Sequence, residues 1–569
     1  MNYKRQNKYL KRIFKIIFLI IFVIIILILA KLFLPSFKKI DYRESVNLET
    51  DEIGVNFQFD YIPMKNSPKY FSGETYLPID FVKQYIDEYI YWDTEENAVT
   101  ITNEKNVIRM KTEEIEYFVN NEPLNLSIPL YNIEGVAYIP VLLLEQIYQL
   151  EIDYNNITKL LSIKKENYKT GVLSKNAMFR KEPNKKSPYI QKLKKGALVY
   201  FYENEENGYT KVEVDGGYIG FITTKVITEI EDKDIKNNYK NDYVNKPNWN
   251  IYDGKINLVF DQMQKVEANS SESRRTYHDG VDVLVPTWFS FKDESGKILN
   301  IADRGYVDWA HNNGYRVWGL LTDNFDKKIS HSVLTSTETR EYVIKQLLAY
   351  VSMYNLDGIN IDFESVPKED GDSFIQFLRE LAPALRKEGV VLSVDLFVPK
   401  PWTAHYNRND VGKIADYVIV MGYDEHYAGS ETAGSVASMS WSEVAIKDTL
   451  AEGVPKEKLI LGIPFYCRVW TETLENGEIK LGSKAYGMNG AYDFIKEKGG
   501  TFTFDEETKQ NYGEAKEDNK TYRVWLEDET SIEQRLDLVL EYDIAGVGAW
   551  KRGLEKEEIW TILKDKLKE

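Results

Sequence analysis

The segment Leu356–Ser365, LDGINIDFES, carries two carboxylates inside an apolar run. Asp362 and Glu364 alternate with Ile361 and Phe363, so on a β-strand the acids face one side and the apolar residues face the other. Two acids on one face can share a proton or a hydrogen bond, which makes carboxylates tolerable within an apolar strand. The segment is therefore a candidate site strand.

Eight apolar, β-rich segments separated by helical patterns follow one another from about residue 251. They are Ile256–Phe260, Val281–Pro286, Arg316–Leu321, Gly358–Phe363, Val390–Leu396, Tyr417–Met421, Leu459–Ile463 and Ala545–Trp550. This alternation predicts an α/β fold, a closed (β/α)₈ TIM barrel. The stretch Thr471–Ile544 is too long for one helix with its loops. It predicts a small α+β insertion, followed by a helix capped at Ser531 with Gln534 at the third helical position.

The acidic strand has a defined orientation in such a barrel. Its odd-numbered apolar residues should face the surrounding helices, whereas Asn360, Asp362 and Glu364 should line the interior. This row rises to the C-terminal mouth, where barrel enzymes place their chemistry. Glu364 should therefore open into a cleft, with Asp362 one layer below it and able to hydrogen-bond to it.

The acidic segment resembles the Asp-Gly-x-Asp-x-Asp-x-Glu signature of glycoside hydrolase family 18, the chitinase-like enzymes. Four further segments resemble this family's pattern in the same order: Met421–Asp424 after the sixth strand, Gly462–Arg468 on the seventh, Trp525–Asp528 before the last helix, and Trp550 at the end of the eighth strand. The resemblance covers residues 251–569.

The resemblance implies specific roles. Glu364 would protonate the glycosidic oxygen, and Asp362 would orient the 2-acetamido group of the substrate, whose carbonyl replaces an enzyme nucleophile. Tyr423 would hydrogen-bond to that carbonyl. The implied substrate-binding residues are Asn360, Asp424, Tyr466, Arg468 and Trp550, with Trp550 under the −1 sugar. Many chitinases have a third Asp at position 360; Asn360 can still hydrogen-bond to Asp362, so this departure bears on the pH profile more than on activity.

Residues 41–165 contain an internal repeat. The segment 76–101 aligns with 138–163 at a constant offset of 62 residues, which pairs Pro78 with Pro140. Each copy reads as a short strand, a helix and a hairpin. The pattern resembles the copper amine oxidase N-terminal-like domain. The resemblance implies no metal here, since all five histidines lie at or beyond His278, and we expect no cofactor.

Residues 170–230 resemble a bacterial SH3-like domain, with five short apolar strands separated by turns rich in Gly, Pro and Asn. Such modules often bind cell-wall peptides, and a spacer role fits equally well. The polar residues 231–250 should form a linker to the barrel.

Composition narrows the possible partners. The chain has 569 residues, 43% of them hydrophobic, so it can form several domains. A formal net charge of −17 argues against a nucleic-acid partner, because phosphate binding needs a concentrated basic surface. Cys467 is the single cysteine, which excludes an internal disulfide and a cysteine-based zinc site.

The N-terminal 40 residues predict a basic tail and a transmembrane anchor. Six Lys and Arg residues between positions 4 and 15 precede the apolar run Ile16–Ala30. A helix over Ile13–Leu34 would be about 33 Å long, enough to cross a hydrocarbon core of about 30 Å. The basic flank should stay in the cytoplasm and place residues 36–569 outside the cell membrane. A cleaved signal peptide is the alternative, although no small-x-small site follows the run.

The leading functional hypothesis is a membrane-anchored glycosidase that cleaves β-1,4 bonds after N-acetylglucosamine in peptidoglycan or spore cortex. A chitinase is the enzymatic alternative. A non-catalytic chitinase-like glycan-binding protein would typically lack the terminal Glu or the assisting Asp, and this chain has both Glu364 and Asp362. A scaffold that recruits partners through its N-terminal modules is a further possibility.

Overall fold

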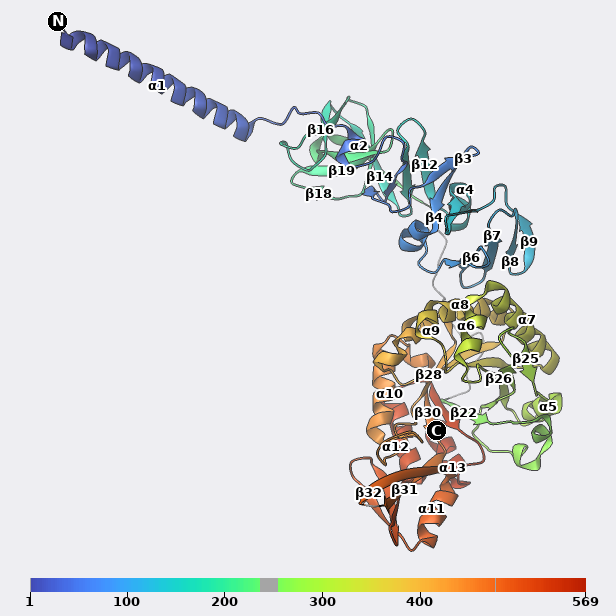
Figure 1. Ribbon diagram of the computed structural model, residues 1–569. Coiled ribbons are helices and arrows are strands. Elements are labelled where there is room, and N and C mark those ends of the chain that lie inside the picture. Colours follow the sequence, from blue (N-terminus) through green and yellow to red (C-terminus); the bar gives the residue numbers. More distant parts are fainter. Residues whose placement is uncertain (1, 236–253, 476, 569) are drawn as a thin grey trace. The chain divides into compact units, whose positions relative to one another are not determined.

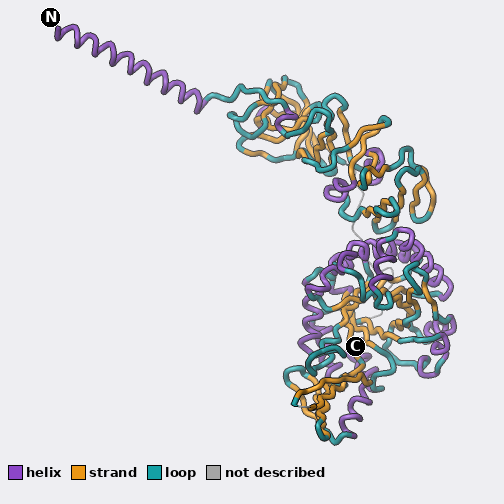
Figure 2. Tube along the Cα trace, in the orientation of Figure 1, coloured by secondary structure: helices purple, strands orange, loops and turns teal. Residues whose placement is uncertain are grey.

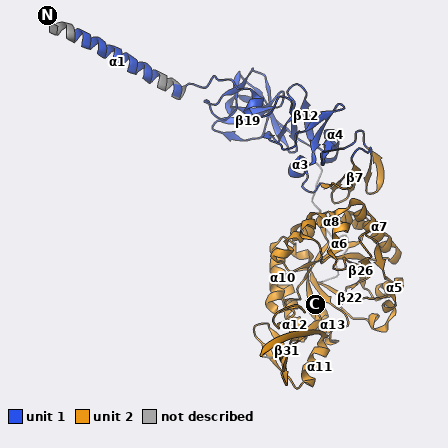
Figure 3. Cartoon of the chain, in the orientation of Figure 1, with its two compact units in different colours: residues 1–90, 112–115, 126–239 blue, residues 91–111, 116–125, 240–569 orange. Residues whose placement is uncertain are grey.

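The computed structural model describes residues 2–235, 254–475 and 477–568 (Figure 1). The chain forms two compact units, which Figure 3 colours separately. The first comprises residues 1–90, 112–115 and 126–239, and the second comprises residues 91–111, 116–125 and 240–569. Residues 236–250 of the predicted linker lie outside the described residues, while residues 231–233 belong to strand β21 (Ile227–Lys233).

Helix α1 (Asn2–Phe33) covers nearly all of the predicted membrane-spanning segment. Among the described residues, no helix combines the length and the apolar character needed to cross a membrane. The side chains of residues 27–30 and 32–33, within the predicted span, lie outside the described part of the chain. The structure therefore gives the transmembrane anchor no support, and it stays a prediction from sequence.

The two repeat copies meet at their first strands in the first unit. Strand β4 (Glu74–Pro78) pairs antiparallel with β11 (Val136–Pro140), so that Pro78 lies opposite Tyr138 and Tyr76 opposite Pro140. The two pairs are equivalent to each other, because the offset of 62 converts Pro78 to Pro140 and Tyr76 to Tyr138, and Leu77 between them pairs with its own equivalent Ile139. Each strand leads into a helical segment, α3 and η1 (Ile79–Phe81, Val82–Ile86) in one copy and α4 (Val141–Tyr148) in the other. The pairing is that expected of two equivalent copies.

The remaining strands of the first unit form further sheets. Strands β10 (Tyr131–Ile133) and β3 (Lys69–Phe71) extend the β11–β4 pair, and β12 (Glu151–Asn155), β13 (Leu160–Lys164), β1 (Gly54–Phe57) and β2 (Asp60–Ile62) form a second sheet. A third sheet contains β14 (Tyr168–Leu173), β15 (Ala177–Arg180), β16 (Tyr189–Leu193), β17 (Leu198–Phe201), β18 (Glu205–Glu206), β19 (Tyr209–Val214), β20 (Tyr218–Thr223) and β21. The likeness of this third sheet to an SH3-like domain stays a prediction.

The barrel contains the eight predicted strands. They are β22 (Ile256–Asp261), β23 (Val283–Pro286), β26 (Arg316–Thr322), β27 (Gly358–Asp362), β28 (Val391–Phe397), β29 (Tyr417–Met421), β30 (Leu459–Pro464) and β36 (Gly546–Trp550). Neighbouring strands are parallel throughout, and the β23–β26 pairing closes the ring. The predicted TIM barrel is confirmed.

Helices surround this ring (Figure 2). They are α5 (Arg304–Asn312), α6 (Lys327–Thr335), α7 (Thr337–Tyr354), α8 (Gly371–Lys387), α9 (Arg408–Ile414), α10 (Met439–Ala451), α12 (Glu529–Glu541) and α13 (Glu558–Lys568). The predicted parity of β27 is confirmed: Ile359 and Ile361 belong to the core shared with the helices, and Phe363 stacks on Phe377 of α8.

Aromatic side chains fill the lower interior of the barrel. Trp318 stacks on Tyr417 with their ring centroids 5.6 Å apart, and both side chains are buried. Gly358 opens β27 beside them, and a Cβ at this position would lie 2.3 Å from the Trp318 ring. Glycine before the acidic row thus allows a tryptophan to plug the barrel below the acids.

The predicted α+β insertion is present. Strands β31 (Tyr466–Glu475), β32 (Glu478–Gly487), β33 (Thr501–Asp505), β34 (Gln510–Glu517) and β35 (Lys520–Trp525) form an antiparallel sheet beside helix α11 (Met488–Glu497). Cys467 lies buried in this element, where its Sγ accepts a hydrogen bond from the amide of Glu527 at 3.1 Å.

The predicted cap of helix α12 is wrong. Asp528 caps the helix, because its carboxylate accepts hydrogen bonds from the amides of Thr530 and Ser531. Ser531 is the third helical residue, and its hydroxyl oxygen accepts a hydrogen bond from the Asp528 amide to complete a capping box. The two residues therefore share the cap, with the start three positions earlier than predicted.

A small sheet from within the repeat region belongs to the second unit. It contains β5 (Tyr91–Asp93), β6 (Ala98–Thr102), β7 (Val107–Lys111), β8 (Glu116–Val119) and β9 (Glu122–Asn125). Arg109 of β7 donates to the fully buried Glu380 of α8 at 2.7 Å, and Arg340 of α7 donates to the other carboxylate oxygen at 2.9 Å. Asp93 accepts hydrogen bonds from the amide and hydroxyl of Thr337. This sheet is therefore joined to the barrel by buried charges.

Candidate active site

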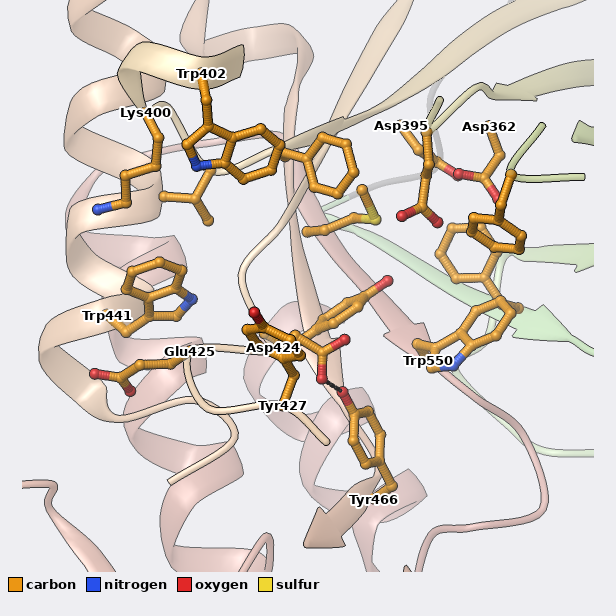
Figure 4. A pocket seen from close by; sticks show the side chains of 17 residues that line it. Asp362, Asp395, Lys400, Trp402, Asp424, Glu425, Tyr427, Trp441, Tyr466 and Trp550 are labelled. Carbon is orange, nitrogen blue, oxygen red and sulfur yellow. Dashed lines mark hydrogen bonds between the residues drawn. The ribbon is translucent and has the colours of Figure 1, made fainter. Parts of the chain in front are cut away.

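A pocket of about 650 Å³ opens beside the C-terminal ends of the barrel strands (Figure 4). This volume falls within the range of small-ligand sites. It is lined by Phe260, Phe325, Asp362, Glu364, Asp395, Phe397, Val398, Lys400, Trp402, Met421, Tyr423, Asp424, Glu425, Tyr427, Trp441, Tyr466 and Trp550. The pocket thus gathers six of the eight residues predicted from sequence.

The acidic pair lies at the end of β27. Burial, together with the charge of Asp323, raises the pKa of Asp362 to about 7. Burial and the neighbouring charges of Asp362, Asp323 and Asp424 raise the pKa of Glu364 to about 8. Glu364 therefore holds its proton in most molecules at neutral pH, which a general acid requires.

Asp323 is a buried acid that the sequence did not single out. It follows β26 directly, accepts a hydrogen bond from the Ser330 hydroxyl at 2.7 Å and accepts another from the Ser365 amide at 2.8 Å. These bonds fix its carboxylate below the loop that carries Glu364. Its position immediately after a barrel strand was the signal that could have identified it.

Asn360 does not make the hydrogen bond predicted for it. Its amide donates instead to Ser393 Oγ at 3.0 Å and to Asp395 Oδ1 at 2.9 Å, both on the neighbouring strand β28. The register explains this, since Asn360 pairs with Ser393 across the two strands. Asn360 thus lies beneath the pocket rather than in its lining.

Asp395 adds a further carboxyl group at the height of Asp362. Burial and the charges of Asp362 and Glu364 raise its pKa well above the usual range, although the hydrogen bond from Asn360 opposes this. Burial and the neighbouring charges thus favour the protonated form of Asp395. In the segment SVDLF, Asp395 comes two positions after Ser393 and therefore faces the same side of the strand. This spacing could have identified Asp395 as an interior acid, although its neighbours in sequence are apolar.

Tyr423 lines the pocket after β29. Burial and the nearby carboxyl of Asp395 raise the pKa of Tyr423 well above its usual value, so the hydroxyl keeps its proton and can donate a hydrogen bond to a substrate oxygen. The Tyr466 hydroxyl donates a hydrogen bond to Oδ1 of the exposed Asp424, and Figure 4 shows this pair. The two tyrosine rings meet edge to face, with their centroids 6.4 Å apart.

The structure places two of the predicted sugar-binding residues, Trp550 and Arg468, in different surroundings. Trp550 ends β36 and lines the pocket, with its ring centroid 5.6 Å from that of Phe260. Arg468 is not among the residues that line the pocket, and its sugar contact stays a prediction. It is the third residue of β31, and its Nη1 donates to Ser483 Oγ on β32 at 3.2 Å. Its strand belongs to the insertion sheet, and its charge still acts on Tyr466, which lines the pocket.

Aromatic and basic residues complete the pocket, and Figure 4 shows Lys400, Trp402 and Trp441 on the side away from Asp362 and Asp395. Phe325, Trp402 and Tyr427 are more than half exposed. Lys400 follows β28, and its Nζ lies 4.7 Å from the ring centroid of Trp441. Sequence reasoning missed these residues because they lie on the segments after the barrel strands or, for Trp441, in the first turn of α10, where no strand pattern marks them. Across the described ranges, no cluster of three or more His, Cys, Asp or Glu residues could hold a metal ion.

Comparison with family models gives two matches. Residues 318–555 match the model described as Glycosyl hydrolases family 18. Residues 57–163 match the model described as Copper amine oxidase N-terminal domain. The first match contains the strands that carry most of the pocket, and the second contains both repeat copies.

Two of the curated relatives come from Bacillus subtilis (strain 168). The uncharacterized glycosylase YvbX is 28% identical over 320 residues, which cover 52% of this chain and 88% of the relative. The cortical fragment-lytic enzyme is 24% identical over 259 residues, which cover 44% of this chain and 58% of that enzyme, less than two thirds of its length. The solved spore cortex-lytic enzyme SleL of Bacillus cereus has a TM-score of 0.50 at 20% identity, covering 59% of this chain and 77% of that protein. This last likeness concerns the fold.

Proposed function

We propose that the barrel cleaves β-1,4 bonds after N-acetylglucosamine in peptidoglycan or spore cortex. The premise is that the barrel belongs to glycosyl hydrolases family 18 and is a glycoside hydrolase. The observation that carries this proposal is the pair Glu364 and Asp362 in one pocket, with Glu364 protonated at neutral pH. Family 18 enzymes use the substrate's own acetamido group as nucleophile.

The proposed mechanism assigns one step to each side chain. Glu364 donates its proton to the glycosidic oxygen, while the acetamido carbonyl attacks the anomeric carbon. Asp362 accepts a hydrogen bond from the acetamido N–H and stabilises the positive charge that develops there. Tyr423 donates a hydrogen bond to the acetamido oxygen. Trp550 lies under the sugar ring, and the Tyr466–Asp424 pair contacts its hydroxyl groups.

The reaction specificity can be tested with the full chain. Purified peptidoglycan and chitin oligosaccharides are incubated separately, and the products are analysed by mass spectrometry. New reducing ends of N-acetylglucosamine from peptidoglycan are expected. New reducing ends of muramic acid would refute the proposed bond, and cleavage of chitin alone would identify a chitinase instead.

The role of Glu364 is tested by Glu364→Gln. The amide keeps the shape but cannot donate the proton, so kcat should fall about 10²–10⁴-fold while oligosaccharide binding survives. Glu497→Gln, on the exposed face of α11, is the matched control and should leave kcat unchanged. Equal losses of binding and turnover in Glu364→Gln would show a structural role, and unchanged turnover would show that Glu364 is not the general acid. Binding without turnover in the unmodified chain would indicate a glycan-binding protein.

The proposed location is the outer face of the cell membrane, with residues 1–40 as the anchor. The basic residues before Ile16–Ala30 support this orientation. Membrane fractionation tests it directly: the full chain should sediment with membranes and resist extraction by salt. Loss of this sedimentation after removal of residues 1–35 would be expected, and recovery of the unaltered chain in the soluble fraction would refute the anchor.

A further inference from the structure

Lys400 is the one basic residue among the described side chains that line the pocket. Five carboxyl groups line the same pocket: Asp362, Glu364, Asp395, Asp424 and Glu425. In Figure 4, Lys400 lies on the same side as Trp402 and Trp441, whereas Asp362 and Asp395 lie on the other. Lys400 therefore lies away from Asp362 and Asp395, and Glu425 is the labelled carboxylate on its own side of the pocket.

The loop that carries Lys400 is held in place from below. Arg408 is buried, and its guanidinium donates to the Phe397 carbonyl at 2.8 Å and to Thr403 Oγ1 at 2.7 Å. Thr403 Oγ1 in turn accepts a hydrogen bond from the Lys400 amide at 3.1 Å. Pro401 begins the 3₁₀ turn that follows. The backbone of Lys400 is thus fixed on both sides, so its ammonium approaches the pocket from a defined point.

The Lys400 ammonium rests on an aromatic face. Its Nζ lies 4.7 Å from the centroid of the Trp441 ring, within the range of a cation–π contact. The nearby acid Glu425 uses its Oε2 to accept a hydrogen bond from the Ser438 amide at 2.7 Å. The indole orients the lysine without neutralising its charge, and the N–H groups that point away from the ring can donate to a ligand.

We propose that Lys400 recognises a carboxylate carried by the glycan, on a sugar next to the N-acetylglucosamine that is cleaved. This inference rests on the proposed function and specifies its substrate class. Chitin is a polymer of uncharged sugars, whereas every second sugar of peptidoglycan carries a lactyl group that ends in a carboxylate or in a peptide with its own carboxylates. Only the second glycan has a group that Lys400 can pair with.

The exposed Trp402 supports this position for the neighbouring sugar. Its ring is 64% exposed and packs against Phe397 with the ring centroids 5.2 Å apart. An indole presented in this way can support the apolar face of a pyranose ring. A sugar on Trp402 would place its substituent beside Lys400, which lies two residues away. The glycan would then cross the pocket from this side toward Asp362.

The test measures kcat/KM on four soluble substrates of equal length. Peptide-bearing strands and peptide-stripped strands distinguish the two sources of carboxylate. Strands whose lactyl carboxylate has been reduced to an alcohol, and chito-oligosaccharides, remove the charge. Lys400→Met should lower kcat/KM about 10–100-fold on a carboxylated strand and leave the two uncharged substrates within about threefold. Lys400→Arg should keep the preference, because it retains the charge.

The outcomes decide the inference in either direction. An equal loss on charged and uncharged substrates would show that Lys400 only supports the loop, and no loss on any substrate would show that it plays no part in recognition. Inactivity of the unmodified chain on all four substrates would instead reject the proposed function. In that case, calorimetric binding of the carboxylated and reduced strands to the unmodified chain and to Lys400→Met still tests the charge preference.

Discussion

The ion pair between Arg109 and Glu380 allows a quantitative test of whether sheet β5–β9 is part of the barrel's folding unit. Arg109→Met keeps most of the side-chain volume but removes the hydrogen bond to Glu380 Oε2 at 2.7 Å. A hydrogen bond to a charged group contributes about 1.5–3 kcal/mol. Glu380 keeps Arg340 and Gln376 on its other oxygen, so the loss should stay within this range rather than reach that of an isolated buried charge.

The expected effect on thermal unfolding follows from the size of the second unit. About 360 residues unfold with an entropy of about 0.75 kcal/mol/K, so 1.5–3 kcal/mol should lower the Tm of this unit by about 2–4 °C. Differential scanning calorimetry of the full chain measures this shift. Lys345→Met is the matched control, because Lys345 pairs with Glu341 on the exposed face of α7 and should change stability by less than about 0.5 kcal/mol.

The pH dependence of the stability loss provides a second test of the ion pair between Arg109 and Glu380. Burial alone would raise the pKa of Glu380, but Arg340 and Arg109 outweigh it and hold the pKa below its usual value. A carboxylate with a lowered folded-state pKa stabilises the fold above its unfolded pKa, and this stabilisation disappears as pH falls through the folded value. The difference between Arg109→Met and the unmodified chain should therefore shrink in acid. A Tm shift confined to the first unit would refute the reasoning.

Three further predictions concern the pocket. The kcat/KM of the enzyme should fall as pH rises through about 8, because Glu364 then loses the proton it must donate. Asp323→Asn should shift this fall in the pH–rate profile to lower pH, because it removes a charge that raises the pKa of Glu364. Asp395→Asn should retain most of the activity at pH 7, since an amide imitates a protonated carboxyl, whereas Asp395→Leu should lose at least tenfold; equal losses would show that Asp395 works as an anion. If the acetamido group is the nucleophile, NMR of the first-formed product should show retained β-configuration and a thiazoline analogue should inhibit; an α-product would contradict the roles of Asp362 and Tyr423.

The barrel and its acidic strand could be predicted because their signals are local. Alternation along β27 requires only that successive side chains point to opposite faces, and this assigns Asp362 and Glu364 to the interior without any knowledge of their neighbours. The residues that line the rest of the pocket could not be predicted from such a local pattern. Lys400 and Trp441 are 41 positions apart in sequence, and their contact joins the loop after β28 to the first turn of α10. No periodicity along the chain reports such a contact.

Some expectations failed because tertiary pairing overrode a local pattern. Asn360 was expected to bond along its own strand to Asp362, but the register with β28 brings Ser393 and Asp395 closer to its amide. The resemblance assigns Arg468 to the sugar; the structure shows its hydrogen bond to Ser483, and the sugar contact stays a prediction. The charges that join β5–β9 to α8 are separated by 271 positions, beyond the reach of any local pattern.

The burial of Cys467 makes the chain a convenient subject for site-directed labelling. Its side chain is inaccessible to solvent, and burial followed by the charge of Glu527 raises the pKa of the thiol well above its usual value. Because the thiolate is the reactive form, alkylating reagents should not modify this residue while the insertion stays closed. A cysteine introduced at an exposed site on the pocket rim could then carry a fluorophore or a spin label without competition from the native thiol. Slow modification of Cys467 itself would measure how often the insertion sheet opens.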